Sequence, residues 1–172
     1  IVSGGELFKA RQSGIPAERI VYSGVGMTRE EIDYALREDN LMFNIESAQE
    51  LEAIDQRAVA MRARARIALR VNPDVDPKTH PYISTGLKKN KFGIDIEQAM
   101  QSYERARTLE HVDVVGIDCH IGSQLTEIPP FVEALERLKV LVCRLGENGI
   151  GIRYLDLGGG LGISYHEEEP PH

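Results

Sequence analysis

The sequence has little of what several classes of protein require. Its two cysteines, Cys119 and Cys143, lie in no metal-type spacing, and no metal site is predicted. Its 20 Lys and Arg residues are outnumbered by 27 Asp and Glu residues, and the net charge of -7 disfavours a nucleic-acid partner. No apolar run approaches the roughly 20 residues of a membrane-spanning helix. We therefore expect a protein of the reducing cytoplasm that binds neither nucleic acid nor a membrane.

Leader-like and linker-like segments are lacking as well. The chain of 172 residues opens on Ile1, without an initiating methionine or a signal-like segment, and no low-complexity stretch divides it. Its 42% hydrophobic and 27% charged residues are typical of an ordinary globular domain. We expect one domain over residues 1–172, and the abrupt start suggests a piece of a longer protein.

Short apolar runs alternate with helix-like stretches along the whole chain. The runs are mostly continuous rather than alternating with polar residues, which is typical of strands covered on both faces in a parallel sheet. The predicted strands are Ile1–Ser3, Ile20–Ser23, Leu41–Ile45, Ala65–Asn72, Val112–His120 and Arg153–Leu157.

Helix starts and helix faces can also be identified. A Ser or Thr followed three residues later by Glu predicts a capping box at Ser3 with Glu6, Thr28 with Glu31, and Ser47 with Glu50. Two later helices carry an apolar stripe that should pack on the sheet. One begins near Asp95 and has the stripe Ile96, Met100 and Tyr103, and the other begins at Pro129 and has the stripe Phe131, Leu135, Leu138, Val142 and Leu145.

Repeated strand–helix units allow two architectures, an open doubly wound sheet or a (β/α)8 barrel. A complete barrel takes about 250 residues. Six predicted strands in 172 residues therefore favour part of a barrel.

In both architectures a ligand binds at the carboxyl ends of the strands. Small, polar or basic residues stand at those ends, as a polar ligand would require, although turns alone also make strand ends polar. These residues are Ser3-Gly4-Gly5, Ser23-Gly24, Asn44, Arg70, Asn72, His120, Ser123 and Gly158-Gly159-Gly160.

The glycine run D-L-G-G-G-L-G over residues 156–162 is a candidate phosphate site, because glycines let backbone N–H groups approach an anion. It matches neither the dinucleotide fingerprint nor the P-loop. A plain tight turn is the alternative, and the position after the last strand favours phosphate.

His120 with Ser123, and Lys91, are further candidates. His120 could stack on a ligand ring while Ser123 binds a phosphate, the alternative being a structural histidine. Cys119 should point to the opposite side of the strand, into the core. Lys91 could be a Schiff-base nucleophile, but the polar residues that precede it favour a solvated lysine. The long segment 73–92 is interpreted as a functional loop, a lid over the substrate.

Several strings, in order along the chain, resemble the bacterial diaminopimelate decarboxylases. The strings are S-G-G-E-L (3–7), H-P-Y-I-S-T-G (80–86), K-F-G (91–93), C-H-I-G-S-Q (119–124) and D-L-G-G-G-L-G (156–162). The resemblance implies an alanine-racemase-like, fold-type III barrel that uses pyridoxal 5′-phosphate (PLP) to convert meso-2,6-diaminopimelate to L-lysine. It implies a homodimer for the intact enzyme.

The resemblance also implies roles for particular residues. His120 would be the catalytic residue that stacks on the cofactor ring, Ser123 would reach the phosphate, and Gly158, Gly159 and Gly160 would offer backbone donors to it. The Schiff-base lysine and the partner of the pyridine nitrogen would lie on the first and last barrel strands, outside this chain. The chain would then hold about strands two to seven, without the C-terminal β domain, and would be inactive alone.

Alternatives stay open at this stage. The same elements occur in decarboxylases of ornithine, arginine or carboxynorspermidine, and H-P-Y-I-S-T-G favours diaminopimelate. A non-catalytic PLP-binding barrel and a nucleotide-binding doubly wound protein are the readings from other classes.

Overall fold

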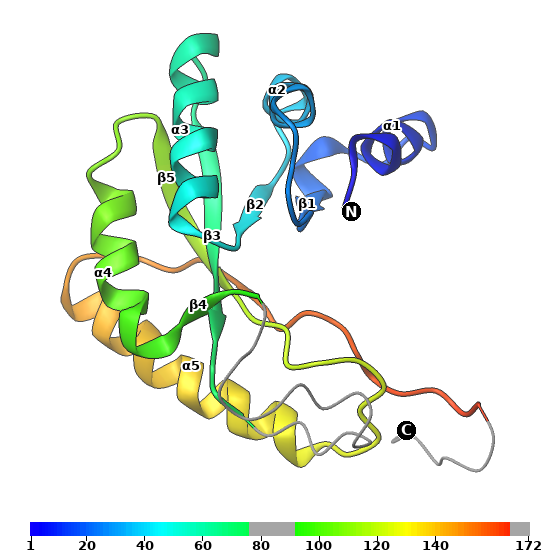
Figure 1. The fold of residues 1–172 in the computed structure, drawn as a ribbon, viewed down its shortest axis with the longest axis vertical. Coiled ribbons are helices and arrows are strands. Elements are labelled where there is room, and N and C mark those ends of the chain that lie inside the picture. The colour runs from blue at the N-terminus through cyan, green and yellow to red at the C-terminus, as the bar shows by residue number, and fades with distance from the viewer. Residues whose placement is uncertain (76–91, 166–172) are drawn as a thin grey trace.

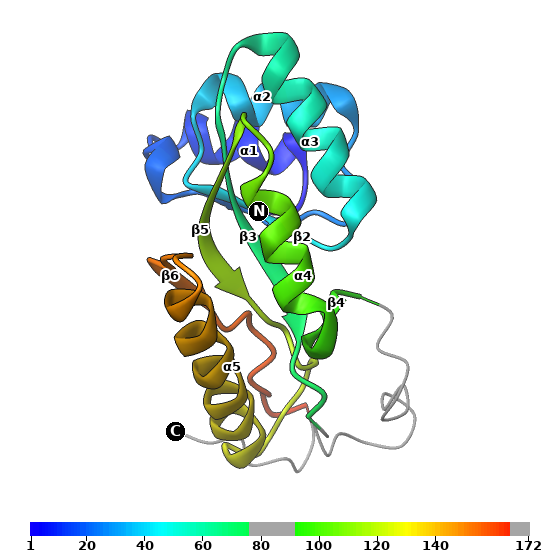
Figure 2. The ribbon, with the colours of Figure 1, turned by 90° about the vertical axis from the view of Figure 1, so that its left-hand side faces the viewer.

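The computed structural model describes residues 1–75 and 92–165. The strands are β1 (Val21–Tyr22), β2 (Met42–Ile45), β3 (Ala65–Asn72), β4 (Ile94–Asp95), β5 (Val112–Asp118) and β6 (Tyr154–Asp156). The helices are α1 (Gly4–Gln12), α2 (Arg29–Glu38), α3 (Ala48–Met61), α4 (Ile96–Arg107) and α5 (Pro129–Glu147), with a 3-10 turn at Ala17–Arg19. The helices follow one another around the outer side of a curled sheet (Figure 1). In Figure 2, α3 and α4 lie in front of β2 and β3.

The sheet order decides between the two expected architectures. All pairings are parallel, and the strands stand in the order β1-β2-β3-β5-β6, with β4 paired to the end of β3. A doubly wound sheet reverses direction at a switch point, whereas barrel strands follow chain order around the sheet. The expected partial barrel is confirmed.

The strand predictions hold with two exceptions. Ile1–Ser3 is not a strand, because Ser3 turns away to cap α1. Only Ile1 pairs with β1, its amino group donating to the Val21 carbonyl (3.0 Å) and its carbonyl accepting from Ser23 N–H (2.8 Å). The strand β4 was not predicted, because its two residues lead directly into α4 and the sequence pattern predicts the start of that helix near Asp95.

The helix caps follow the predicted serines and threonine. At Thr28 the capping box with Glu31 is complete. Ser3 and Ser47 accept from the predicted N–H groups, but the returning carboxylates of Glu6 and Glu50 bind the N–H groups of Val2 (2.7 Å) and Glu46 (2.6 Å). The glutamates therefore cap one residue earlier than a standard box.

The main core lies between the sheet and the helices. On the strands it includes Phe43, Ile45, Ile67, Leu69 and Ile117. The stripe of α5 has the predicted period but is rotated about the helix axis. Its most buried face is formed by Ala134, Leu138, Leu141 and Leu145, while Phe131, Leu135 and Val142 are partly exposed. On α4, likewise, Ala99, Tyr103 and Ala106 are buried, with Ile96 and Met100 at the core margin.

The inner, concave face of the sheet has much less apolar packing. Its small cluster of buried apolar residues is Met42, Ala68 and Val115. Polar side chains occupy the part of this face near the carboxyl ends of the strands. In the described part of the chain, no helix is long and apolar enough to cross a membrane. No three acidic, His or Cys side chains among those same residues group as metal ligands would.

Candidate cofactor site

The loops after β5 and β6 run side by side beyond the sheet. Cys119 N–H donates to the Asp156 carbonyl (2.9 Å), which extends the pairing of the two strands. Further along, Leu125 N–H donates to the Gly160 carbonyl (2.9 Å) and Gly162 N–H donates to the Leu125 carbonyl (2.8 Å). This pairing brings the segment that contains His120 and Ser123 against the glycine run.

The glycine turn needs glycine at Gly158 and at Gly160, which have φ values of +68° and +98°. A Cβ atom on Gly158 would lie 2.8 Å from His120 Nδ1, and one on Gly160 would lie 1.8 Å from the Gly122 carbonyl oxygen. At Gly159, by contrast, a Cβ would meet nothing within 4 Å. The turn is therefore pressed against the histidine loop on one side and open at its middle residue.

The N–H groups of the turn are not equivalent. Gly158 N–H donates to Asp156 Oδ1 (2.8 Å), so it is already engaged. Within residues 1–75 and 92–165, the N–H groups of Gly159 and Gly160 donate to no other group. Two free backbone donors beside a ring form a cradle that fits a phosphate carried by an aromatic ligand.

His120 is partly buried beside this cradle. Burial lowers the pKa of its imidazole, and the nearby positive charge of Arg70 lowers the pKa further. The ring is therefore neutral at physiological pH. Ser123, in the same loop, is exposed. Cys119 lies in the core as expected, and burial raises the pKa of its thiol to about 12.

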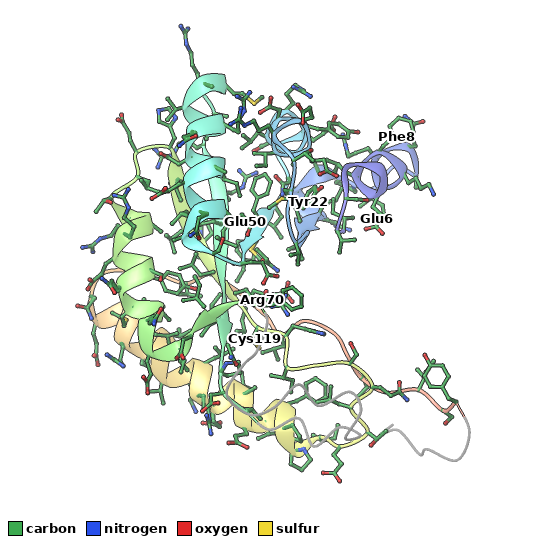
Figure 3. All side chains as sticks on the ribbon, viewed as in Figure 1. Glu6, Phe8, Tyr22, Glu50, Arg70 and Cys119 are labelled. Carbon is green, nitrogen blue, oxygen red and sulfur yellow. The ribbon has the colours of Figure 1, made fainter. Side chains whose placement is uncertain are left out.

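Arg70 is held in place at the end of β3. Its Nη1 donates to Glu46 Oε1, and its guanidinium carbon lies 5.7 Å from the centre of the Phe92 ring. The side chains of Arg70 and Glu46 are only 15% and 10% exposed. Arg70 and Cys119 lie near one another where the strands end (Figure 3). Arg70 and Glu46 thus form a largely buried ion pair at the mouth of the partial barrel.

Asn44, on β2, contacts a residue just after the neighbouring strand β1 and a residue of the distant strand β6. Its Nδ2 donates to Ser23 Oγ (2.8 Å), after β1, and to Asp156 Oδ2 (3.0 Å), on β6. Asp118, next to Asp156 in the sheet, is 4% exposed. Burial, and then the charge of Asp156, raise the pKa of Asp118 to about 7.

Comparison with known proteins places these features in a family. The whole chain, residues 1–172, matches the family model described as "Pyridoxal-dependent decarboxylase, pyridoxal binding domain". The chain belongs to this family. It is therefore a pyridoxal-binding domain of the fold-type III decarboxylases, and the resemblance deduced from the sequence strings is confirmed.

The relatives of this pyridoxal-binding domain include diaminopimelate decarboxylases. That of Aquifex aeolicus is 55% identical over 169 residues, covering 98% of the chain and 40% of the relative. That of Haemophilus influenzae is 54% identical over 172 residues, covering 100% and 41%. The chain thus spans about two fifths of the length of these curated relatives.

Solved structures of decarboxylases also match this chain. The diaminopimelate decarboxylase of Helicobacter pylori complexed with L-lysine matches with a TM-score of 0.91 and 43% identity, covering 98% of the chain and 43% of that structure. The lysine/ornithine decarboxylase of Vibrio vulnificus, at 24% identity and a TM-score of 0.78, shares the fold.

The pyridoxal-binding domain does not bring all of the predicted residues into one site. Ser3 caps α1, and Gly4 N–H donates to Glu31 Oε1 on α2 (2.8 Å), so this predicted strand end is engaged by helices instead. Asn72 accepts from Asp74 N–H (3.0 Å) in the turn after β3. Lys91, the string H-P-Y-I-S-T-G and most of the predicted lid lie outside the described residues.

Sequence reasoning missed several members of the site. Asp118 and Asp156 gave no signal beyond being acidic residues at the ends of predicted strands. Glu46 follows Asn44 at the end of β2 and could have been found by the same rule that selected Asn44. Glu50, labelled in Figure 3, accepts from Glu46 N–H (2.6 Å), and burial is the main cause that raises the pKa of its carboxyl to about 7.

Proposed function

We propose that this chain is the cofactor-binding part of a diaminopimelate decarboxylase, which removes CO2 from meso-2,6-diaminopimelate to give L-lysine. The observation that carries the proposal is the His120 ring packed against a glycine turn with free N–H groups at Gly159 and Gly160. The choice of substrate is supported by the sequence identity of this chain to solved structures. Structures of diaminopimelate decarboxylases match at 43–48%, whereas those of the lysine/ornithine and arginine decarboxylases match at 24–25%.

Each site residue then has a role toward pyridoxal 5′-phosphate. The neutral ring of His120 stacks on the pyridine ring, and a neutral imidazole does not repel the electron-poor ring as a cation would. The N–H groups of Gly159 and Gly160 bind the phosphate, with the hydroxyl of Ser123 as a third donor. Gly158 holds the shape of the turn. When bound, the cofactor would supply the electron sink for the charge left as CO2 departs.

Arg70 affects this arrangement through its positive charge. Burial is the main cause that lowers the pKa of His120, and the positive charge of Arg70, which is paired with Glu46, lowers it further and so favours the neutral ring. In the intact protein we propose an amino-acid substrate, assembly as a homodimer and a place in the cytoplasm.

The test uses the full-length protein that carries this sequence. Release of CO2 from meso-diaminopimelate, ornithine and arginine is compared, and we expect turnover of meso-diaminopimelate alone. Faster turnover of ornithine or arginine would overturn the substrate assignment. PLP binding without any turnover would favour the non-catalytic barrel.

A matched pair of histidine variants tests the stacking role. His120→Ala should raise the Kd for PLP at least tenfold, and His120→Phe should recover part of the loss because a ring is restored. His111 lies before β5, at the opposite end of the strand, where Nδ1 is 2.8 Å from the Ala63 carbonyl oxygen. His111→Ala should leave the Kd unchanged. Equal effects of the two alanine variants would refute the assigned role of His120.

A further inference from the structure

We propose that Asn44 is a positioning residue for the phosphate-binding turn, acting through Asp156. This inference rests on the proposed function, since it concerns the same cofactor. The Asp156 carboxylate uses its two oxygens in different directions. Oδ1 accepts from Gly158 N–H (2.8 Å), and Oδ2 accepts from Asn44 Nδ2 (3.0 Å). The turn is thereby connected to β2 on the other side of the inner face.

The connection depends on the shape of the sheet between the two residues. Asn44 is paired in register with Ala68, and Ala68 with Gly116. A Cβ atom on Gly116 would lie 3.1 Å from the Cβ of Ala68 and 3.1 Å from the sulfur of Met42. Larger side chains in this row would fill the space that the Asn44 amide crosses. The small residues therefore let Asn44 reach Asp156 over β3 and β5.

The other end of the link is also fixed. Asn44 Nδ2 donates to Ser23 Oγ (2.8 Å), and Asn44 is 1% exposed. Its Oδ1 is buried and accepts from no group in the described part of the chain. Burying an unpaired carbonyl oxygen opposes folding, so stability alone does not account for an amide at this position. Holding Asp156, and with it the turn, does account for it.

The link sets where the free donors of the turn lie. Gly158 N–H is held by Asp156, which leaves the next two N–H groups, those of Gly159 and Gly160, available to the phosphate. Loss of the Asn44 amide would release Asp156 Oδ2 while leaving Asp118 beside it, and the turn would sample other positions. Such a change weakens contacts to the phosphate and spares contacts to the pyridine ring.

The decisive measurement compares PLP with pyridoxal, which lacks the phosphate, in titrations of the full-length apoprotein. Asn44→Ala should raise the Kd for PLP about tenfold and leave the Kd for pyridoxal within about twofold. A general loss of structure would weaken both ligands equally, and that result would overturn the inference. So would an unchanged Kd for PLP.

Exchanging the two side chains provides a rescue test. Asn44→Asp alone places two carboxylates face to face and should weaken PLP binding more than Asn44→Ala does. In the double variant Asn44→Asp, Asp156→Asn, the new amide at 156 can donate to the new carboxylate at 44 and still accept from Gly158 N–H. We expect the double variant to bind PLP more tightly than Asn44→Asp. Binding no tighter than that single variant would contradict the link.

Asn40 offers a matched control at the opposite end of the same strand. It is also buried, and its Nδ2 donates to the Met42 carbonyl (2.9 Å). Asn40→Ala should lower the thermal midpoint without changing the ratio of the two Kd values. Measurements on the unmodified protein distinguish a failure of the proposed function from a failure of the role proposed for Asn44. If it binds PLP but does not decarboxylate meso-diaminopimelate, the proposed function fails while the PLP-to-pyridoxal comparison still decides the role of Asn44.

Discussion

Gly160 packs so closely on Gly122 that a Cβ atom on Gly160 would stand 1.8 Å from the Gly122 carbonyl oxygen. Since Gly122 follows β5 and Gly160 follows β6, this contact fits the two loops together. The cradle is therefore a property of both loops, and its geometry depends on the absence of a side chain at one position. A matched substitution within the same turn can test this dependence.

Gly160→Ala should destabilise the protein and impair the cradle. Its φ of +98° is strained for alanine, and the contact with Gly122 would force the loops apart. We expect a loss of at least about 2 kcal/mol in the free energy of unfolding, measured by urea denaturation. Gly159→Ala, where the added Cβ meets nothing within 4 Å, should change the stability by no more than about 0.5 kcal/mol. Similar losses in the two variants would show that the loops are not closely fitted.

Asp118 should make the stability fall as the pH rises. Burial raises its pKa from 3.8 to about 7 in the folded protein, so between these values the folded state holds a proton that the unfolded state has released. Folding stability is therefore highest below about pH 4 for this group and is lost up to about pH 7, by an amount on the order of 4 kcal/mol.

The variant Asp118→Asn isolates this contribution, because the amide resembles the protonated acid. The free energy of unfolding is measured with urea at pH 4.5 and at pH 7.5 for both proteins. The difference, variant minus unmodified protein, should be larger at pH 7.5 than at pH 4.5. A stability difference that does not vary with pH would mean that Asp118 does not titrate in this range.

Local rules predicted much of this molecule, and the parts that they missed depend on three-dimensional curvature. The sheet order and the pairing of the His120 loop with the glycine turn follow from strands whose carboxyl ends share one edge. The contact of Asn44 with Asp156 could not be predicted, because it crosses β3 and β5 and exists only where the sheet curls. Ile1–Ser3 was predicted as a strand from its apolar start, but the capping preference of Ser3 decided the local structure.

The ion pair of Arg70 with Glu46 should be costly to break. Arg70→Met leaves the carboxylate of Glu46, which is 10% exposed, without its cation. Removing one partner of a buried pair costs about 3–5 kcal/mol. The exposed pair of Arg64 and Asp113, with side chains 58% and 42% exposed, is the control, and Arg64→Ala should cost no more than about 1 kcal/mol.

Chemical denaturation of both variants gives the comparison. Adding Glu46→Gln to Arg70→Met removes the stranded charge and should recover part of the lost stability. If Arg70→Met costs no more than Arg64→Ala, the carboxylate of Glu46 is better solvated than its burial indicates. The pH titration of His120 by NMR provides a second readout, since loss of the Arg70 charge should raise the pKa of the imidazole.

The isolated 172-residue chain should associate with itself. The strand β6 lies at one edge of the sheet, and its Tyr154 and Leu155 are 38% and 47% exposed. An unpaired edge with exposed apolar side chains is a template for pairing with another strand. Sedimentation should therefore give a mass above the 19.2 kDa of one chain. Leu155→Lys should shift the chain toward the monomer, whereas Val59→Lys, at an exposed position of α3, should not. A monomeric chain would contradict this prediction.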